Sequence, residues 1–476
     1  MLLARTALPE APAPARERAL RLLDRRLGGS KVLSGREACD AYARDESEAI
    51  GRVPDAVVRA ASADDLAVAL AVARETGVPI TPRGGGTGRT GGAVPLAGGI
   101  VLDTSSLGRI KEIDLREQLA VVEPGVVLAE LQARVEEVGL FYPPDPSSLE
   151  SCCLGGNVAE NAGGPRAFKY GVTRDWVLGV EAFLVGGQRI HAGRRTRKGV
   201  TGYDVTGLLV GSEGTLAVLG DVTLRLAPKP PAVVTLLALF ADVRRAACAV
   251  QEITGAGLIP RCLELLDDET LRAVRRAGNP IDERAGAMLL IELDGDPAAC
   301  EADAERTGEA CVAAAALDVL VAKDSAQRER LWAARRRMSP AVRSLTRFKL
   351  SEDVVVPRQR LVELLERNAR TCERERVRTL TYGHAGDGNL HVNFLWDDDD
   401  ELPRVSAAIE QLFRDTVALG GTLSGEHGIG VLKAPYLPIE QSPELIALQR
   451  DLKRVFDPEG LLNPGKIFPA LGHGAC

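Results

Sequence analysis

The sequence predicts a multidomain α+β protein, and three observations point to this fold class. Residues 52–82 have the pattern strand, helix, strand, and they run into a glycine-rich loop and a further strand. Pro228, Pro230 and Pro231 then interrupt the chain, which is typical of a domain boundary. From residue 232 the pattern becomes strand, helix, strand, strand, helix, strand, which is that of an α+β plait. A chain of 476 residues has room for about two to four domains.

The first strand, helix and strand lead into a loop that can bind an anion. The strand "AVVRAAS" precedes a helix that a capping box between Ser62 and Asp65 opens, and the strand "VPITP" follows. Six glycines then fall between residues 84 and 92, ahead of another strand, "GGIVLDTS". A Rossmann fingerprint has a helix after its glycines and a P-loop ends in GKS or GKT, so neither motif is present. Backbone N–H groups in this loop can wrap a pyrophosphate, and a flexible linker is the alternative.

A second unit completes the first domain, which we expect over residues 51–230, after an N-terminal helical segment at 1–50. It begins with the strand "LAVVEPGV", the amphipathic helix "LAELQARVEEVG" and the extended stretch "FYPPDPSS". Gly186 and Gly187 predict a hairpin turn between two further strands. The stretch "VGSEGTLAVLGDVTLRLAPKP" closes the domain.

The plait forms the second domain, expected over residues 231–420, and residues 421–476 form a C-terminal segment. We expect strands at 233–240, 259–265, 287–293 and 317–322, and helices at 242–255, 298–314 and 324–338.

Two of only five histidines flank one turn in the stretch "YGHAGDGNLHVN", residues 382–393. Asp387-Gly388 is a favoured two-residue hairpin turn. With that turn His384 faces His391, with Cβ atoms within ~5.5 Å on one sheet face, while Leu390 and the alternate residues after it point to the other. Two imidazoles placed in this way could share a metal. A polar pair satisfied by hydrogen bonds is the alternative.

Composition and charge exclude several classes of protein. The net charge of −7 gives no basic surface that would bind nucleic acid or anionic lipid. Prolines at positions 9, 12 and 14 break any apolar core of a signal peptide, and no run of about 18 apolar residues occurs, so we expect a cytoplasmic protein. The nine cysteines contain no CxxC pair, which indicates neither a disulfide framework nor an iron–sulfur cluster.

Six motifs in order resemble those of a known family. They are "PRGGGTGRTGG", "GGNVAENAGG", "GSEGTL", "GHAGDGNLH", "GEHGIG" and "NPGKIF". Over residues 50–470 the chain resembles the flavin-linked 2-hydroxyacid dehydrogenases of the vanillyl-alcohol-oxidase superfamily, of the glycolate, D-lactate or D-2-hydroxyglutarate type. The resemblance implies a two-subdomain FAD-binding domain at 51–230, a ferredoxin-like α+β substrate cap at 231–420, and a C-terminal segment, 421–476, that returns to the flavin.

The resemblance also implies a set of cofactor-binding residues. Residues of the first glycine loop would hold the pyrophosphate: Arg83, Gly84, Gly85, Gly86, Thr87, Gly88 and Gly91. Others would line the flavin or approach it from the tail: Pro144, Ser147, Gly155, Gly156, Asn157, Asn161, Gly163, Gly211, Glu213, Gly214 and Asn463. Some relatives tether FAD through a histidine in the first loop, and none lies there in this sequence, so we expect non-covalent FAD.

The same resemblance assigns His384, His391 and Glu426 as ligands of a divalent metal (zinc, manganese or iron) and His427 as catalytic base. Two histidines and one glutamate are a typical catalytic ligand set that leaves positions open for substrate oxygen. If Glu426 and His427 are extended, their side chains diverge, so one can hold metal while the other reaches substrate.

Two cations complete the predicted site. Arg335 shares a helical face with the apolar Leu331, Trp332 and Met338, so its charge needs an anionic partner. By resemblance Arg335 would bind the substrate carboxylate, and Lys349 matches a second such position less closely.

The resemblance implies FAD-dependent oxidation of a small 2-hydroxy acid to the 2-oxo acid. His427 would take the hydroxyl proton while a hydride passes from Cα to the flavin N5. Electrons would leave to a separate acceptor: a quinone, a partner subunit, an electron-transfer flavoprotein or oxygen. Peripheral membrane association through a partner and a homodimeric state stay open. So do two alternative functions, a flavin-free metal hydrolase and a catalytically idle flavoprotein subunit.

Overall fold

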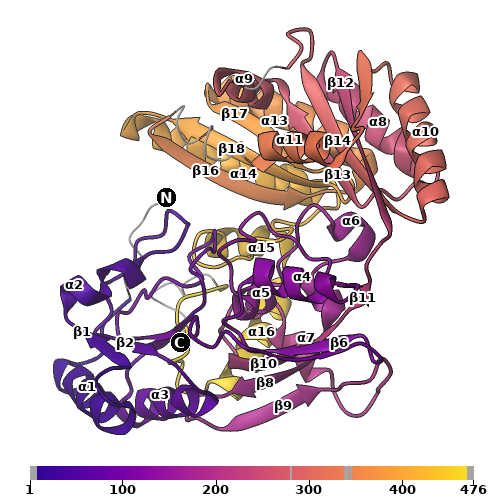
Figure 1. The fold of residues 1–476 in the computed structure, drawn as a ribbon. Coiled ribbons are helices and arrows are strands. Elements are labelled where there is room, and N and C mark those ends of the chain that lie inside the picture. Colours follow the sequence, from indigo (N-terminus) through magenta and orange to yellow (C-terminus); the bar gives the residue numbers. More distant parts are fainter. Residues whose placement is uncertain (1–7, 279–280, 337–341, 343–345, 469–476) are drawn as a thin grey trace.

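The computed structural model describes residues 8–278, 281–336, 342 and 346–468, with the backbone alone for 333–336. Its elements form two parts (Figure 1), which we call the N-terminal part (residues 8–230) and the cap (231–420). The N-terminal part contains a four-stranded and a five-stranded sheet, and the cap contains one seven-stranded sheet. This arrangement agrees with the predicted α+β class.

The four-stranded sheet, in the order β1-β2-β4-β3, carries the glycine-rich loop after its edge strand β3. Strands β2, β4 and β3 are parallel, as a strand, helix, strand unit requires. The predicted capping box is confirmed: Ser62 Oγ accepts the Asp65 N–H and the Asp65 carboxylate accepts the Ser62 N–H. The bounds are α1 Ala13–Leu27, β1 Val32–Ser34, α2 Arg36–Cys39, η1 Asp40–Ala43, β2 Ala56–Arg59, α3 Ala63–Thr76, β3 Ile80–Arg83 and β4 Ile100–Asp103.

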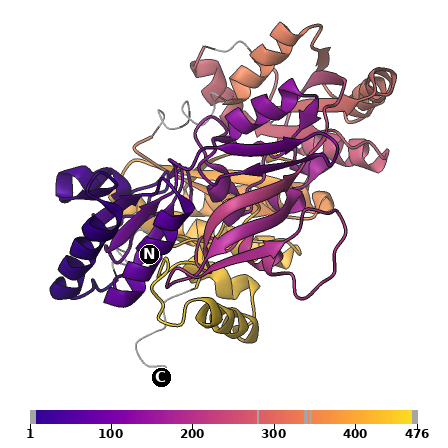
Figure 2. The same ribbon diagram turned by 60° about the horizontal axis from the view of Figure 1, so that its bottom comes forward.

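The N-terminal segment is not helical throughout, in contrast to the prediction for residues 1–50. Its strand β1 pairs antiparallel with β2 and extends the four-stranded sheet. A strand of three residues is too short to leave an alternating pattern in the sequence. Figure 2 separates this indigo sheet, with α1 and α3 beside it, from the magenta five-stranded sheet.

The five-stranded sheet, in the order β5-β6-β10-β8-β9, is antiparallel. Its apolar side chains form one core with those of α4 and α5. The hairpin predicted at Gly186 and Gly187 joins β8 to β9, and both glycines have positive φ. The bounds are β5 Ile110–Asp114, β6 Leu119–Val122, α4 Leu128–Glu137, β7 Leu140–Phe141, α5 Leu154–Glu160, α6 Ala167–Tyr170, η2 Thr173–Trp176, β8 Val177–Phe183, β9 Arg189–Gly193, α7 Val205–Leu209, β10 Val218–Arg225 and β11 Ala227–Pro228.

The cap confirms the predicted plait and extends it. Its sheet order is β15-β12-β14-β13-β17-β18-β16, and the first four strands have the ferredoxin-like order. Helices α8, α10, α13 and α14 cover one face. A helix the pattern did not predict, α9, separates β13 from β14. The bounds are β12 Ala232–Phe240, α8 Val243–Gly255, β13 Cys262–Asp267, α9 Asp268–Arg276, β14 Ala287–Gly295, α10 Pro297–Ala313, β15 Asp318–Val321, α11 Ser325–Arg336, β16 Phe348–Val355, η3 Arg358–Arg360, α13 Leu361–Glu375, β17 Arg378–His384, β18 Asn389–Trp396, η4 Asp399–Glu401 and α14 Leu402–Ala418.

The histidine hairpin has a different register from the predicted one. His384 pairs with Asn389 and His391 pairs with Tyr382, so the turn has four residues and the two-residue turn was wrong. Gly388 explains the longer turn, because a Cβ there would lie 2.0 Å from the Val356 carbonyl oxygen. The slip is two residues, and alternation has a period of two, so both histidines still share one face.

The C-terminal segment joins the two parts. Leu432 and Tyr436 pack against the cap core, and the chain then returns to β3. There the Ile80 N–H donates to the Leu461 carbonyl oxygen and the Asn463 N–H donates to the Ile80 carbonyl oxygen, both at 2.8 Å. In Figure 1 α15 lies under the cap and α16 lies by the N-terminal part. The bounds are η5 Ala434–Tyr436, α15 Leu437–Glu440 and α16 Pro443–Phe456.

Substitution of Asn463 tests how strongly the C-terminal segment is held against β3. Its buried Nδ2 donates to the carbonyl oxygens of Gly92 and Glu213, both at 2.9 Å, and its φ is 45°. Glycine adopts that φ without strain, so Asn463→Gly removes the side chain and its two bonds without straining the backbone, and we expect it to lower the free energy of unfolding by about 2–3 kcal/mol. Ser62→Ala, which removes a helix cap, should cost about 1 kcal/mol. Denaturant unfolding of the protein without FAD compares them, and an Asn463→Gly loss no larger than that of Ser62→Ala would contradict the role of the amide.

Candidate functional site

A cavity runs beside the first glycine loop, α5 and β10. Most of the predicted cofactor residues line it: Arg83, Gly84, Gly85, Gly86, Thr87, Gly88, Ser147, Gly155, Gly156, Asn157, Gly163, Glu213 and Gly214. We call it the flavin cavity.

Five residues of the predicted cofactor set do not line this cavity: Gly91, Pro144, Asn161, Gly211 and Asn463. Asn463 Nδ2 bonds to the backbone of two lining residues, Gly92 and Glu213, whereas the Asn161 Oδ1 accepts the Arg174 N–H at 2.8 Å. Asn463 therefore supports the wall of the cavity from outside.

The glycines of the cavity fall into two kinds. A Cβ on Gly85 would lie 2.4 Å from the Ser151 carbonyl oxygen, so the fold itself requires glycine there. Around Gly88 the nearest described atom is an Asp45 oxygen at 3.6 Å, and around Gly156 nothing lies within 4 Å. At these two positions the missing side chains leave space on the cavity side. That space is a cradle in which backbone can approach a bound cofactor closely.

A second cavity of about 690 Å³ lies under the cap sheet. Among its walls are Trp332, Tyr382 and the three predicted metal ligands. We call it the substrate cavity. Glu426 and His427 line both cavities, so the two cavities meet at this pair of residues.

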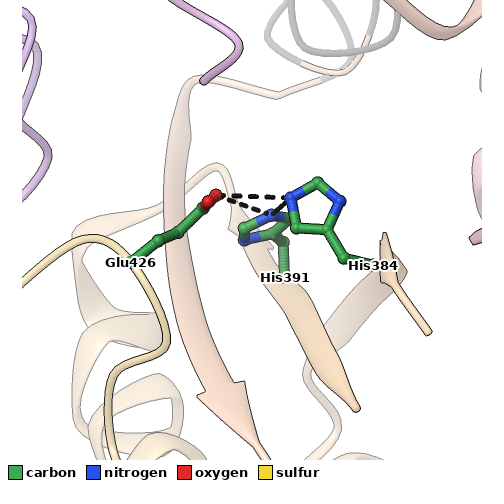
Figure 3. A group of neighbouring side chains, drawn as sticks. All are labelled: His384, His391 and Glu426. Carbon is green, nitrogen blue, oxygen red and sulfur yellow. Dashed lines mark hydrogen bonds and ion pairs between the residues drawn. The ribbon is translucent and has the colours of Figure 1, made fainter. Parts of the chain in front are cut away.

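The three predicted metal ligands converge in the structure (Figure 3). His384 Nε2 lies 3.4 Å from His391 Nε2, and Glu426 Oε1 lies 3.4 Å and 3.5 Å from these two nitrogens. An ion with four tetrahedral bonds of about 2.1 Å separates its ligands by about 3.4 Å. The donor set therefore fits a divalent metal in type and in spacing.

Glu264 on β13 orients the first of these histidines. Its Oε1 lies 2.5 Å from His384 Nδ1, which leaves Nε2 to face the other two ligands, as a carboxylate behind a metal-binding histidine does. Burial alone would lower the pKa of His384, but the carboxylates of Glu264 and Glu426 raise it well above its usual value. A bound cation would take the place of that proton.

Asp353 on β16 holds the loop that carries Glu426 and His427. Its Oδ2 accepts the N–H groups of residues 425–427 at 2.8–3.0 Å and the Ser424 hydroxyl at 3.0 Å. Burial would raise the pKa of Asp353, but attraction to the protonated form of His427, the charge of Lys433 and the donated N–H groups hold it well below its usual range. The buried carboxylate therefore stays ionised.

His427 lies at the junction of the two cavities, on the loop that Asp353 holds. Its ring stacks on that of His391, with centroids 5.2 Å apart, and among the described residues its Nδ1 has no hydrogen-bond partner. Burial lowers the pKa of His427, although the carboxylates of Asp353 and Glu426 oppose the shift. The imidazole is therefore neutral at neutral pH and able to accept a proton.

The two predicted cations differ in what the structure describes. Lys349 lies on β16 and lines the substrate cavity. Arg335 lies on α11, and its side chain is outside the described residues, as is all of Met338. Trp332 of the same helix lines the cavity, and its Nε1 donates to Glu292 Oε1 at 2.7 Å.

Several residues of the site were missed from the sequence, namely Glu264, Asp353, Glu160 and Arg89. A signal existed for Glu264, because it is an acid between leucines in the strand "CLELLD". The strand of Asp353, "FKLSEDVV", is half polar and gave no such signal. A buried acid requires a partner. Glu160 and Arg89 lay inside motifs quoted above but carried no predicted role.

Comparison with known proteins identifies the family. Residues 54–193 match the model of the FAD binding domain, and residues 229–467 match that of the C-terminal domain of FAD linked oxidases. The chain belongs to the FAD-linked oxidase family. It is 40% identical over 432 residues to glycolate oxidase subunit GlcD of Bacillus subtilis, covering 90% of this chain and 92% of the relative. It is 33% identical to D-lactate dehydrogenase of Anaerostipes hadrus over 449 residues, or 92% and 94% of the two chains.

Solved structures agree on the fold of this FAD-linked oxidoreductase. Substrate-bound p-cresol methylhydroxylase superposes with a TM-score of 0.80 at 16% identity, covering 97% of this chain and 98% of the other. The predicted vanillyl-alcohol-oxidase type of fold is thereby confirmed. No helix in the described ranges is both long and apolar enough to span a bilayer.

The open space at Gly88 gives a clean test of the flavin cavity. A Cβ there would lie no closer than 3.6 Å to a described side chain or more distant backbone, but a valine would occupy space next to a bound cofactor. We expect Gly88→Val to keep the thermal stability of the FAD-free protein and to weaken FAD affinity at least ~100-fold, which is a loss of about 3 kcal/mol. Flavin fluorescence on titration with FAD measures it.

The matched control is Gly29→Val, in a turn after α1 where nothing lies within 4 Å and φ is not positive. It should bind FAD as the unaltered protein does. Full FAD affinity in Gly88→Val would show that the loop is not part of the cofactor site.

Proposed function

We propose that this protein oxidises a small 2-hydroxy acid to the 2-oxo acid by hydride transfer to FAD. The observation that carries the proposal is the position of His427, a neutral base at the junction of the flavin and substrate cavities. Relatives named as a glycolate oxidase subunit and as a D-lactate dehydrogenase support this substrate class. FAD-linked family membership argues against a flavin-free hydrolase.

Substrate binding falls to the groups around the substrate cavity. His384, His391 and Glu426 would hold a divalent metal (zinc, manganese or iron), which supplies a Lewis acid for the hydroxyl and carboxylate oxygens. Lys349 on the cavity wall and Arg335 on α11 would bind the carboxylate through charge. Both roles favour a substrate with a hydroxyl next to a carboxylate.

Proton removal falls to His427. Its neutral imidazole accepts the hydroxyl proton as the Cα–H bond breaks, and the stacked ring of His391 and the loop bonds to Asp353 keep it in place. Bound FAD supplies the acceptor for the hydride. We propose that FAD is held without a covalent bond, since residues 83–92 include no histidine.

Electrons then leave to a separate acceptor, which we propose is a quinone, a partner subunit or an electron-transfer flavoprotein. Two relatives, from Bacillus subtilis and Escherichia coli, are named as subunits, which supports assembly with partners. We propose a cytoplasmic location, with any contact to a membrane made through such a partner.

His427→Asn tests the base. Removing a general base slows the step it serves by roughly 10²- to 10⁴-fold. We therefore expect the variant to keep FAD and metal and to reduce its flavin at least ~100-fold more slowly, a barrier increase of about 3 kcal/mol. Anaerobic stopped-flow with D-lactate, glycolate and D-2-hydroxyglutarate measures this rate, and it also tests the idle-subunit alternative. Flavin reduction at the unaltered rate, with a Cα-deuterium effect present, would mean that another residue is the base.

His391→Ala tests the metal site. We expect the purified protein to hold about one divalent ion per chain and the variant to hold less than about a tenth of that, because two ligands bind a metal far more weakly than three. His191→Ala is the control, since that imidazole is exposed on β9. Elemental analysis gives occupancy and absorbance gives FAD content. Equal metal in the His391→Ala and His191→Ala proteins would rule out the ligand set.

A further inference from the structure

A carboxyl group with no role in the proposed reaction faces the flavin cavity. It belongs to Glu160, the last residue of α5. A Cβ on Gly92 would lie 2.7 Å from its Oε1, and a Cβ on Gly428 would lie 2.5 Å from its Oε2. Glycine at both positions makes room for this carboxyl group. Its Oε2 is buried and has no hydrogen-bond partner among the described residues.

A second buried carboxyl group lies close to it. Glu213 Oε1 is 2.9 Å from the same Cβ position on Gly428. Glu160 Oε2 is 2.5 Å from that position, so the two carboxyl oxygens are at most 5.4 Å apart. Two buried carboxyl groups this close do not both ionise.

The hydrogen bonds decide which of the two keeps the proton. Glu213 accepts the N–H of Ile429 at 2.7 Å and that of Gly430 at 2.6 Å, and such bonds favour the carboxylate form. Glu160 Oε2 accepts none from the described residues. The proton therefore belongs on Glu160.

The remaining charges around Glu160 leave it neutral. Lys466 is near, but its Nζ donates to the backbone carbonyl oxygens of Gly91, Gly92 and Val94. Burial raises the pKa of Glu160 well above its usual value, and Glu213 and Asp45 raise it further against the opposing charge of Lys466. Glu160 Oε2 has no hydrogen-bond partner among the described residues, and Glu160 lines the flavin cavity, so a carboxyl O–H there can turn to a bound cofactor.

The position of Glu160 indicates which part of FAD it meets. Gly428, which it contacts, follows His427, and His427 lines both cavities. The flavin ring must reach this junction if His427 acts on a substrate, a step that rests on the proposed function. Glu160 would then face the ring rather than the adenosine.

We propose that Glu160 is a neutral carboxylic acid that donates a hydrogen bond to the bound flavin ring and raises its reduction potential. Two-electron reduction places negative charge on the ring, and a donor stabilises that charge. An ionised carboxylate in the same place would oppose it. The charge state of Glu160 therefore decides whether this residue raises or lowers the reduction potential of the flavin.

Two substitutions separate these cases in the FAD-loaded protein. Glu160→Gln keeps a neutral donor of the same shape, and Glu160→Leu removes the donor. We expect Glu160→Gln to change the equilibrium between reduced and oxidised flavin less than about threefold. Glu160→Leu should shift it at least ~10-fold towards the oxidised form, or ~30 mV for two electrons. Glu130→Leu, at an exposed position on α4, is the control and should change nothing.

Redox titration against reference dyes measures the potential, with a chemical reductant and no hydroxy acid. In Glu160→Gln, a shift of the equilibrium by ~10-fold or more towards reduced flavin, or ~30 mV, would show that an anion was removed and would overturn the proposal. An unchanged potential in Glu160→Leu would overturn it too. If Glu160→Leu does not retain FAD, Glu160→Ala takes its place. The infrared band of a protonated carboxyl group, present in the holoprotein and absent in Glu160→Gln, is a second measurement.

The titration also distinguishes this inference from the proposed function. A holoprotein that oxidises no 2-hydroxy acid but shows the Glu160→Leu shift would refute the function and leave the hydrogen bond standing. Normal turnover of a 2-hydroxy acid with no change of potential in Glu160→Leu would refute the hydrogen bond and leave the proposed function standing.

Discussion

The carboxylate of Asp353 is the constraint on which the rest of the site depends. It is fully buried on a cap strand and accepts hydrogen bonds from the C-terminal loop that carries Glu426 and His427. On the same strand pair it lies opposite His391. One buried charge thus sets the positions of Glu426 and His427 relative to the cap sheet. Such a charge is stable only when its donors are complete, which makes the loop and the strand a single unit.

The same loop is held from the other side by Glu213, whose carboxylate accepts the N–H groups of Ile429 and Gly430. The segment from residue 424 to 430 is therefore bound by one acid from the cap and one from the N-terminal part. Lys433 adds bonds to the carbonyl oxygens of Asp353 and Leu423. Because these contacts are charge-assisted and buried, they fix the junction where the flavin and substrate cavities meet.

Local patterns predicted much of the fold and the residues near the hairpin. Alternation with a period of two puts His384 and His391 on one face for a turn of two or of four residues, and that part was correct. The turn length was not, because Gly388 must pass close to the Val356 carbonyl oxygen, a contact outside the hairpin. Strand β1 and helix α9 were missed because they are short. The motifs located the glycine loops and the cluster of His384, His391 and Glu426. Asp353 and Glu264 act on residues 72 and 120 positions away, which no local pattern encodes.

Buried polar atoms in a folded chain are normally paired, so those without a partner mark places with a special role. Three such atoms among the described residues belong to the junction: Glu160 Oε2, Glu426 Oε2 and His427 Nδ1. All three residues line the flavin cavity, and the last two also line the substrate cavity. The fold uses Asp353, Glu213 and Glu264 to saturate the backbone and one imidazole, and it leaves these atoms free. The cost of desolvation at such positions is offset only when something binds there, so the unpaired atoms mark the junction of the two cavities as a binding site.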